Sequence, residues 1–178
     1  YVTTPSRDNI PQENDWNRSL IKATSELISE CLIHFRKAGL MCTDLLEALP
    51  INPEEFQSDS MFLPIYNSVR EAFIRKPLLP TQDGDFIRAN QGKLSRGADL
   101  RNLFSKDQLQ GLFNSDVPLC WLPGDITSDR KPQIRSYLMQ ELGIEEITPE
   151  SAVRRLTKAF LQKQPDAWFV NFYQFLDA

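Results

Sequence analysis

The sequence contains little of the residue types that usually bind metals or form disulfides: one histidine, three cysteines and no CxxC pair in 178 residues. Zinc centres take four ligands from these types, so no metal site is expected. Cys31, Cys42 and Cys120 are odd in number and widely spaced, which argues against disulfides and for a reducing, cytoplasmic setting. They are expected in or near the core. No apolar run reaches the length of a membrane span, so no membrane contact is expected.

Common catalytic and phosphate-binding motifs are also missing. The sequence has no GxxxxGK[ST], GxGxxG, GxSxG or HExxH pattern, and its net charge of -4 gives no general attraction to nucleic acid. Two carboxylate pairs, Glu145 with Glu146 and Asp83 with Asp85, fit turns or a solvated surface better than catalysis. His34 stands alone on a helical segment, where a structural role is favoured. A free-standing enzyme therefore has no residue set to support it.

The apolar fraction of 41% and eleven phenylalanines provide enough material for a packed core. We predict a mainly helical α+β fold with a long N-terminal helix, a small β-hairpin and a helical C-terminal part. A division near residue 76 would give a first segment, 1–76, with the long helix, and a second, 77–178, with the hairpin and a helical subdomain. One continuous domain is the alternative.

Periodicity and end signals place the elements. Helices are predicted at 15–38, 42–49, 59–75, 99–104, 106–113, 129–142, from Pro149 and from Pro165. Residues 1–5 are predicted to end a strand, 78–89 to form a hairpin around Asp83-Gly84, 90–98 to form a loop and 117–122 to form a short strand.

The buried stripe of the long helix is predicted to comprise Trp16, Leu20, Ala23, Leu27, Cys31 and Phe35, widened by Ile21, Ile28 and Leu32. Arg154, Arg155 and Lys158 are interpreted as a solvated basic face.

The last helix carries a dense aromatic face of Trp168, Phe169, Phe172 and Tyr173. Aromatic stripes at helical spacing usually pack inward, so a core role is favoured. The alternative is a protein-interaction module in which this aromatic face and the long N-terminal helix bind a partner or a protein client.

Arg7 is the strongest candidate for a functional residue. It follows the hydroxyl-bearing residues Thr3, Thr4 and Ser6 and precedes the N-terminus of the long helix, which favours anions. A guanidinium in this position could hold a phosphate oxygen through two parallel hydrogen bonds. A solvated loop arginine is the ordinary alternative.

Three stretches resemble the region after the nucleotide-binding fold of sacsin-like proteins, which carry an ATPase domain of the ninety-kilodalton heat-shock chaperone type. Their "TTSRE-I…WN–L" pattern is similar to Val2–Ile10 followed by Trp16–Leu20, and their "LPT-DG" hairpin is similar to Leu78–Gly84. Their "L–ELGVEEVTPE" segment is similar to Leu138–Glu150. The resemblance thus reaches from one end of the chain to the other through short motifs.

The heat-shock chaperone itself has a related "N-SRE-LQ" loop, whose arginine reaches the γ-phosphate of ATP bound by a preceding domain. The resemblance places Arg7 in that role, with Ser6 and Gln12 beside the nucleotide. Asp8 stands where glutamate is usual, and Pro11 where the chaperone has glutamine, so that Gln12 lies one place late.

The resemblance implies that ATP and Mg²⁺ belong to an upstream nucleotide-binding domain of the same protein, because nothing here matches the asparagine and glycine-rich lid of that domain. The chain begins at Tyr1 without an initiator methionine, which suggests a piece of a larger protein. Alone, it is expected to be inactive.

Overall fold

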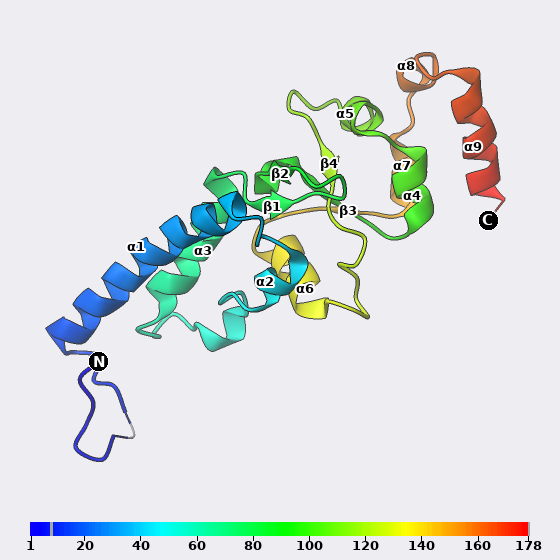
Figure 1. The fold of residues 1–178 in the computed structure, drawn as a ribbon. Coiled ribbons are helices and arrows are strands. Elements are labelled where there is room, and N and C mark those ends of the chain that lie inside the picture. The colour runs from blue at the N-terminus through cyan, green and yellow to red at the C-terminus, as the bar shows by residue number, and fades with distance from the viewer. Residues whose placement is uncertain (8, 178) are drawn as a thin grey trace.

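The fold is α+β and mainly helical, as predicted, in a computed structural model that describes residues 1–7 and 9–177 (Figure 1). The α-helices of this described part are α1 (Asp15–Lys37), α2 (Thr43–Glu47), α3 (Leu63–Arg75), α4 (Ala98–Leu103), α5 (Lys106–Phe113), α6 (Pro132–Gln140), α7 (Pro149–Arg155), α8 (Lys158–Leu161) and α9 (Asp166–Leu176). Short 3-10 turns lie at Pro53–Glu55 and Ala89–Gln91. The strands are β1 (Leu79–Pro80), β2 (Phe86–Ile87), β3 (Gly92–Ser95), β4 (Cys120–Trp121) and β5 (Glu146–Ile147).

The long N-terminal helix, α1, begins and ends at the signals in the sequence. The side chain of Asn14 accepts the backbone N–H of Asn17 at 3.1 Å, which caps the first turn. At the other end, Gly39 has a φ of +71°, and the N–H groups of Gly39 and Leu40 bond back to Arg36 and Phe35. This left-handed ending favours glycine and closes the helix. Helix α1 then packs along α3.

The buried face of α1 is rotated from the predicted one. Ile21 and Leu32 are buried as predicted, but Trp16 and Leu27 are 62% and 58% exposed, and Ala23 is exposed as well. Asn17 and Ser25, which are polar, occupy buried positions instead. The prediction failed because α3 covers only one side of the helix, and a broad apolar stripe does not say which side that will be.

A three-stranded parallel sheet runs through the middle of the molecule, with β3 between β4 and β5. Side chains of successive residues in β4 enter different cores: Cys120 and Leu122 join one hydrophobic cluster and Trp121 the other. Leu94 of β3 lies in the first cluster and Ile147 of β5 in the second. Helices cover both faces of the sheet, as parallel sheets require.

The predicted loop at 90–98 is wrong, because these residues contain the central strand β3. Its sequence, Gly92-Lys93-Leu94-Ser95, has one large apolar side chain and therefore resembles a loop. Gly92 is buried, and a Cβ atom there would lie 3.4 Å from side-chain atoms of Ile144 and Leu122. Neighbouring side chains therefore pack directly against the backbone of this glycine.

The other elements follow the sequence more closely. β1 and β2 form the predicted antiparallel hairpin, with Leu79 opposite Ile87 and Gly84 at a φ of +85° in the turn. The helix predicted at 59–75 begins only at Leu63, because turns occupy the residues before it. The strand predicted at 1–5 is wrong: described residues 1–7 contain no strand.

The first cluster lies among α1, α3, α6 and the hairpin, and its residues come from both sides of residue 76. The second lies among α4, α5, α7, α8 and α9. In Figure 1 the N-terminal loop lies at the far end of the α1–α3 pair, and α9 stands at the opposite end of the molecule. Within the described residues, no helix is both long and apolar enough to cross a bilayer.

Candidate functional site

Arg7 belongs to the loop before α1. This N-terminal loop lies at one end of the molecule (Figure 1). The backbone N–H of Arg7 donates to the carbonyl oxygen of Thr4 at 2.9 Å, and the N–H of Thr4 donates to the carbonyl oxygen of Asn9 at 3.0 Å. These two hydrogen bonds join residues on opposite sides of the loop. Arg7 is therefore held at a turn while its side chain remains exposed.

The backbone of Arg7 is left-handed, with a φ of +60°. A residue with a Cβ atom pays roughly 1–2 kcal/mol for this conformation, and Asn114 is the other described non-glycine residue that adopts it. Such positions are concentrated at functional sites, where surrounding contacts hold the strain. Here those contacts come from Thr4 and from the anchors at the base of the loop.

The main anchor is Asn17, in the first turn of α1, whose side chain is fully buried. Its Oδ1 accepts the N–H of Val2 at 2.7 Å, while its Nδ2 donates to the carbonyl oxygens of Val2 at 2.8 Å and Pro11 at 3.2 Å. One amide thus joins both ends of the loop to the helix. Its role was not predicted, although a signal existed: Asn17 precedes Ile21 by four residues and so lies on the same face of the helix.

Two further contacts hold the loop. The Nε of Arg18 donates to the carbonyl oxygen of Gln12 at 2.9 Å, and the same guanidinium pairs with Glu13. The ring of Tyr1 meets the ring of Phe62 edge to face, with centroids 6.2 Å apart. The loop is therefore attached both to α1 and to the segment before α3.

The loop and the segment before α3 border an open groove of about 530 Å³, lined by Thr3, Arg7, Asn9, Ile10, Gln12, Ser60, Met61 and Phe62. The structure thus brings Arg7 and Gln12 to the same groove. Ser6 is not among its lining residues, and its Oγ lies 3.2 Å from the Oγ1 of Thr4. Asp8, the motif position where glutamate is usual, lies outside the described residues.

Among the described residues that line the groove, the charge balance favours an anion, because Arg7 is the charged one. Its guanidinium makes no ion pair with any described carboxylate. Ser60 and the amide groups of Asn9 and Gln12 add neutral polar atoms. The N-terminus of α1 contributes less than expected, because Asn14 already takes the N–H of Asn17 and Asp15 adds a negative charge to the first turn.

Glu145 and Glu146, one of the two carboxylate pairs noted in the sequence, both form ion pairs with basic side chains. Glu146 accepts two hydrogen bonds from Arg135, both at 2.8 Å, and these lower the pKa of the carboxyl group. Burial alone would raise the pKa of Glu145, but bonds from Arg155 and Lys93 outweigh it and the pKa is lowered. Neither group is available as a proton acceptor near neutral pH without breaking its pair.

Arg154, Arg155 and Lys158 are exposed, as predicted for a basic face, and one of them, Arg155, also has partners. This residue pairs with Glu145, and its guanidinium carbon lies 4.4 Å from the centre of the Phe113 ring. The ammonium group of Lys93 lies 4.3 Å from the same ring. Phe113 thus holds two cations by cation–π contact.

The cysteines differ from one another. Cys120 is buried, as predicted, and burial raises the pKa of its thiol; Cys31 is half-buried. Cys42 is exposed, so the prediction of a core or near-core position is wrong for it. It directly precedes α2, where its side chain covers no neighbour. All three are unpaired, and no cluster of metal-binding side chains occurs within residues 1–7 and 9–177.

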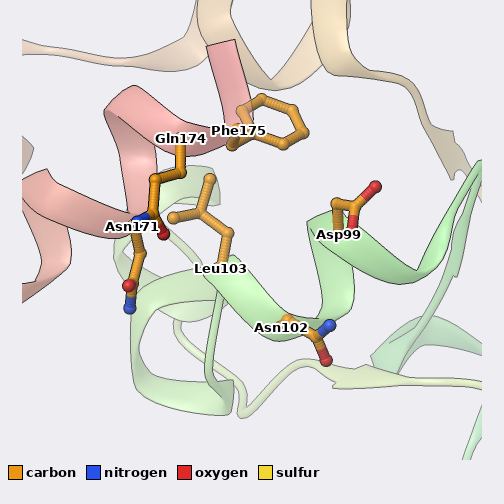
Figure 2. Close-up of a pocket in the computed structure, with 6 residues that line it drawn as sticks. All are labelled: Asp99, Asn102, Leu103, Asn171, Gln174 and Phe175. Atoms are coloured by element: carbon orange, nitrogen blue, oxygen red, sulfur yellow. The ribbon is translucent and has the colours of Figure 1, made fainter. Parts of the chain in front are cut away.

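A second cavity, of about 290 Å³, lies between α4 and α9. Figure 2 shows Asp99, Asn102 and Leu103 on α4 facing Asn171, Gln174 and Phe175 on α9. The polar atoms here are mainly amides, and the described lining includes no base or nucleophile beside the carboxylate of Asp99. This cavity can accept hydrogen bonds but has no arrangement for catalysis.

Part of the aromatic face of α9 is buried, as in a core, and part is exposed, as in a binding surface. Trp168 is buried and donates its indole N–H to the carbonyl oxygen of Leu103 at 2.9 Å, while Phe169 and Phe172 are half-buried. Tyr173 is 64% exposed. Other apolar residues on the outer side of the helix are also more than half exposed: Val170 and Leu176.

Comparisons of the chain with models of protein families, with curated proteins and with solved structures find no match. The geometry of the Arg7 loop and the sequence motifs therefore carry the functional argument.

Proposed function

We propose that this chain is the segment that follows the nucleotide-binding domain in a sacsin-like, chaperone-type ATPase. In this proposal Arg7 contacts the γ-phosphate of ATP held by that domain, and the segment couples the nucleotide state to a change in conformation. The chain alone hydrolyses no ATP, because ATP and Mg²⁺ are bound by the other domain.

The single observation that supports this role best is the combination of restraint and exposure at Arg7. The backbone is fixed in a left-handed turn, and the loop is fastened to α1 by a buried amide. The guanidinium nevertheless makes no ion pair with a described carboxylate. A cation that is positioned in advance and has no ion pair among the described residues suits a ligand that arrives from another domain.

The chemistry expected of Arg7 is electrostatic. A transferring phosphoryl group spreads negative charge over its oxygens, and a guanidinium can stabilise that charge with two hydrogen bonds. Gln12, on the same groove, can donate an amide hydrogen to a phosphate oxygen or orient the attacking water. The serine of the motif, Ser6, lies within the loop and helps to shape it through Thr4.

The experiment is to measure ATP turnover and ATP binding of the full-length protein with Arg7→Ala. Turnover should fall strongly while ATP still binds, because the nucleotide is held by the other domain. Arg130→Ala is the matched control, since Arg130 is also an exposed arginine in a turn but lies before α6, far along the chain from the loop. Unchanged turnover in Arg7→Ala would remove the mechanism.

A second candidate function is the binding of a protein client through α9. Its outer side exposes Val170, Tyr173 and Leu176, which recur at intervals of three residues and form one apolar strip. Such a strip suits unfolded polypeptide with exposed apolar side chains.

This alternative predicts that the chain slows the aggregation of a chemically unfolded model protein and that Val170→Ser with Leu176→Ser removes the effect. Val117→Ser is the control, because Val117 is an exposed valine on another part of the surface. Equal suppression by the double variant would exclude the strip as the binding surface.

We also propose the cytoplasm as the location. The three cysteines are unpaired, and one of them, Cys42, is exposed, which suits a reducing compartment.

A further inference from the structure

We infer that Asn17 is the positioning residue of the Arg7 loop: its buried carboxamide fixes both ends of the loop and thereby sets where the guanidinium points. This inference rests on the proposed role of Arg7. It adds a residue that touches neither ATP nor the reacting phosphate and acts only through the loop.

The side-chain amide of Asn17 bonds to both ends of the loop. Oδ1 and Nδ2 of Asn17 bond to the N–H and the C=O of Val2, at 2.7 and 2.8 Å, as a neighbouring strand would. The second hydrogen of Nδ2 reaches the carbonyl oxygen of Pro11 at 3.2 Å. Val2 and Pro11 stand on either side of the loop, so one planar group defines the distance between its ends.

Because Asn17 is buried, its side chain determines the position of the loop and not the reverse. Asn17 has no exposed surface, and an amide that lost these partners would remain unsatisfied away from water. Its backbone N–H is separately capped by Asn14 at 3.1 Å, which holds the residue in the first turn of α1. The side chain therefore cannot follow a moving loop, and the loop must conform to the helix.

The contacts within the loop carry this restraint to Arg7. Thr4 follows Val2 by two residues, and its N–H and C=O bond to Asn9 and Arg7 respectively. Fixing Val2 thus restricts Thr4, and Thr4 restricts the left-handed backbone of Arg7. The other hydrogen bonds at the base of the loop, from Arg18 to Gln12 and Glu13 and from the N–H of Asn14 to Pro11, hold only the second end of the loop.

The test compares Asn17→Leu with Ser25→Ala. The leucine has the same branched shape and a better helix propensity but is larger and cannot hydrogen bond, and the N–H that Asn14 caps is retained. Ser25→Ala removes another buried polar group of α1, whose hydroxyl bonds only to Lys22 within the helix. This control matches the loss of a buried polar side chain without touching the loop.

The first readout needs only this chain. The ¹⁵N heteronuclear NOE of Thr3, Thr4 and Arg7 should fall to the level of a free chain end in Asn17→Leu and stay high in Ser25→Ala. Amide signals of the buried residues Leu32 and Val69 should remain in place, which shows that α1 and α3 are still packed. Unchanged values at Thr4 and Arg7 would overturn the inference.

The second readout separates this inference from the proposed function. In the full-length protein, Asn17→Leu should lower kcat by roughly tenfold to a hundredfold with KM for ATP nearly unchanged, because a misplaced guanidinium affects the transition state alone. If Arg7→Ala lowers kcat and Asn17→Leu does not, the positioning role is wrong. If Arg7→Ala has no effect, the proposed function fails, and the NOE values alone decide whether Asn17 holds the loop.

Discussion

Asn17 pairs with both backbone polar groups of Val2, although fifteen residues separate the two in the chain. The pair closes the N-terminal loop in the absence of a strand, because a side-chain amide occupies the place of a neighbouring backbone. The loop that carries Arg7 is thus built onto the first turn of α1.

Asn17→Asp should make stability depend on pH. Aspartate keeps the oxygen that accepts from Val2 but, when ionised, faces the carbonyl oxygens of Val2 and Pro11 from a buried position. Its pKa in the folded state is therefore raised above that of the unfolded chain. The folded state then binds more protons, so stability is lost as pH rises above about 4.

Thermal unfolding followed by circular dichroism checks this. The melting temperature of Asn17→Asp should fall further below that of the natural chain at about pH 7 than at about pH 4. Equal deficits at the two pH values would argue that the carboxylate is solvated and that the amide does not form the described bonds.

Trp168→Phe should destabilise the second hydrophobic cluster. The indole N–H caps the carbonyl oxygen of Leu103 at the end of α4, and phenylalanine leaves that buried oxygen without a donor. We expect a loss of roughly 1–3 kcal/mol in the free energy of unfolding, measured with urea. Trp16→Phe is the control, because Trp16 is 62% exposed and should change stability by about 0.5 kcal/mol or less.

Glu146→Gln should lower stability near neutral pH and remove part of its dependence on pH. Arg135 holds the pKa of Glu146 below its usual range, so the pair stabilises the fold above the unfolded pKa of about 4.3. That contribution disappears as pH falls through the folded pKa.

Urea unfolding across a pH series measures the effect. The variant should be less stable by roughly 1.5–3 kcal/mol at about pH 7, and the difference should shrink as the solution becomes more acidic than about pH 4. The exposed Glu54 supplies the control, Glu54→Gln. A difference that stays constant through the acid range would mean that the ion pair is not the cause.

Local signals in the sequence were enough for the parts of the fold that depend on neighbouring residues. Ser105 caps α5, and Thr148 before Pro149 caps α7, both with hydrogen bonds to the first turn. Asp83-Gly84 forms the turn of the hairpin. Each of these elements is decided within a few residues of the chain.

Features that depend on distant partners were not predictable in the same way. β3 is a strand because β4 and β5 flank it and helices cover both faces, and its four residues carry no such pattern by themselves. Trp16 is exposed because α3 packs on another side of α1.

The candidate site, too, was predictable only where it depends on neighbouring residues. Arg7 could be singled out from its chemistry and from a motif, whereas the role of Asn17 depends on a loop that folds back over fifteen residues.

ATP turnover by the full-length protein with Arg7→Ala, beside Arg130→Ala, is the decisive measurement for the contact between Arg7 and the γ-phosphate. The proposed contact with the γ-phosphate predicts that kcat falls by about a thousandfold or more, while ATP binding and the NOE values of the loop remain as in the natural protein. Arg130→Ala should keep full turnover. A kcat for Arg7→Ala equal to that of the natural protein would contradict the account.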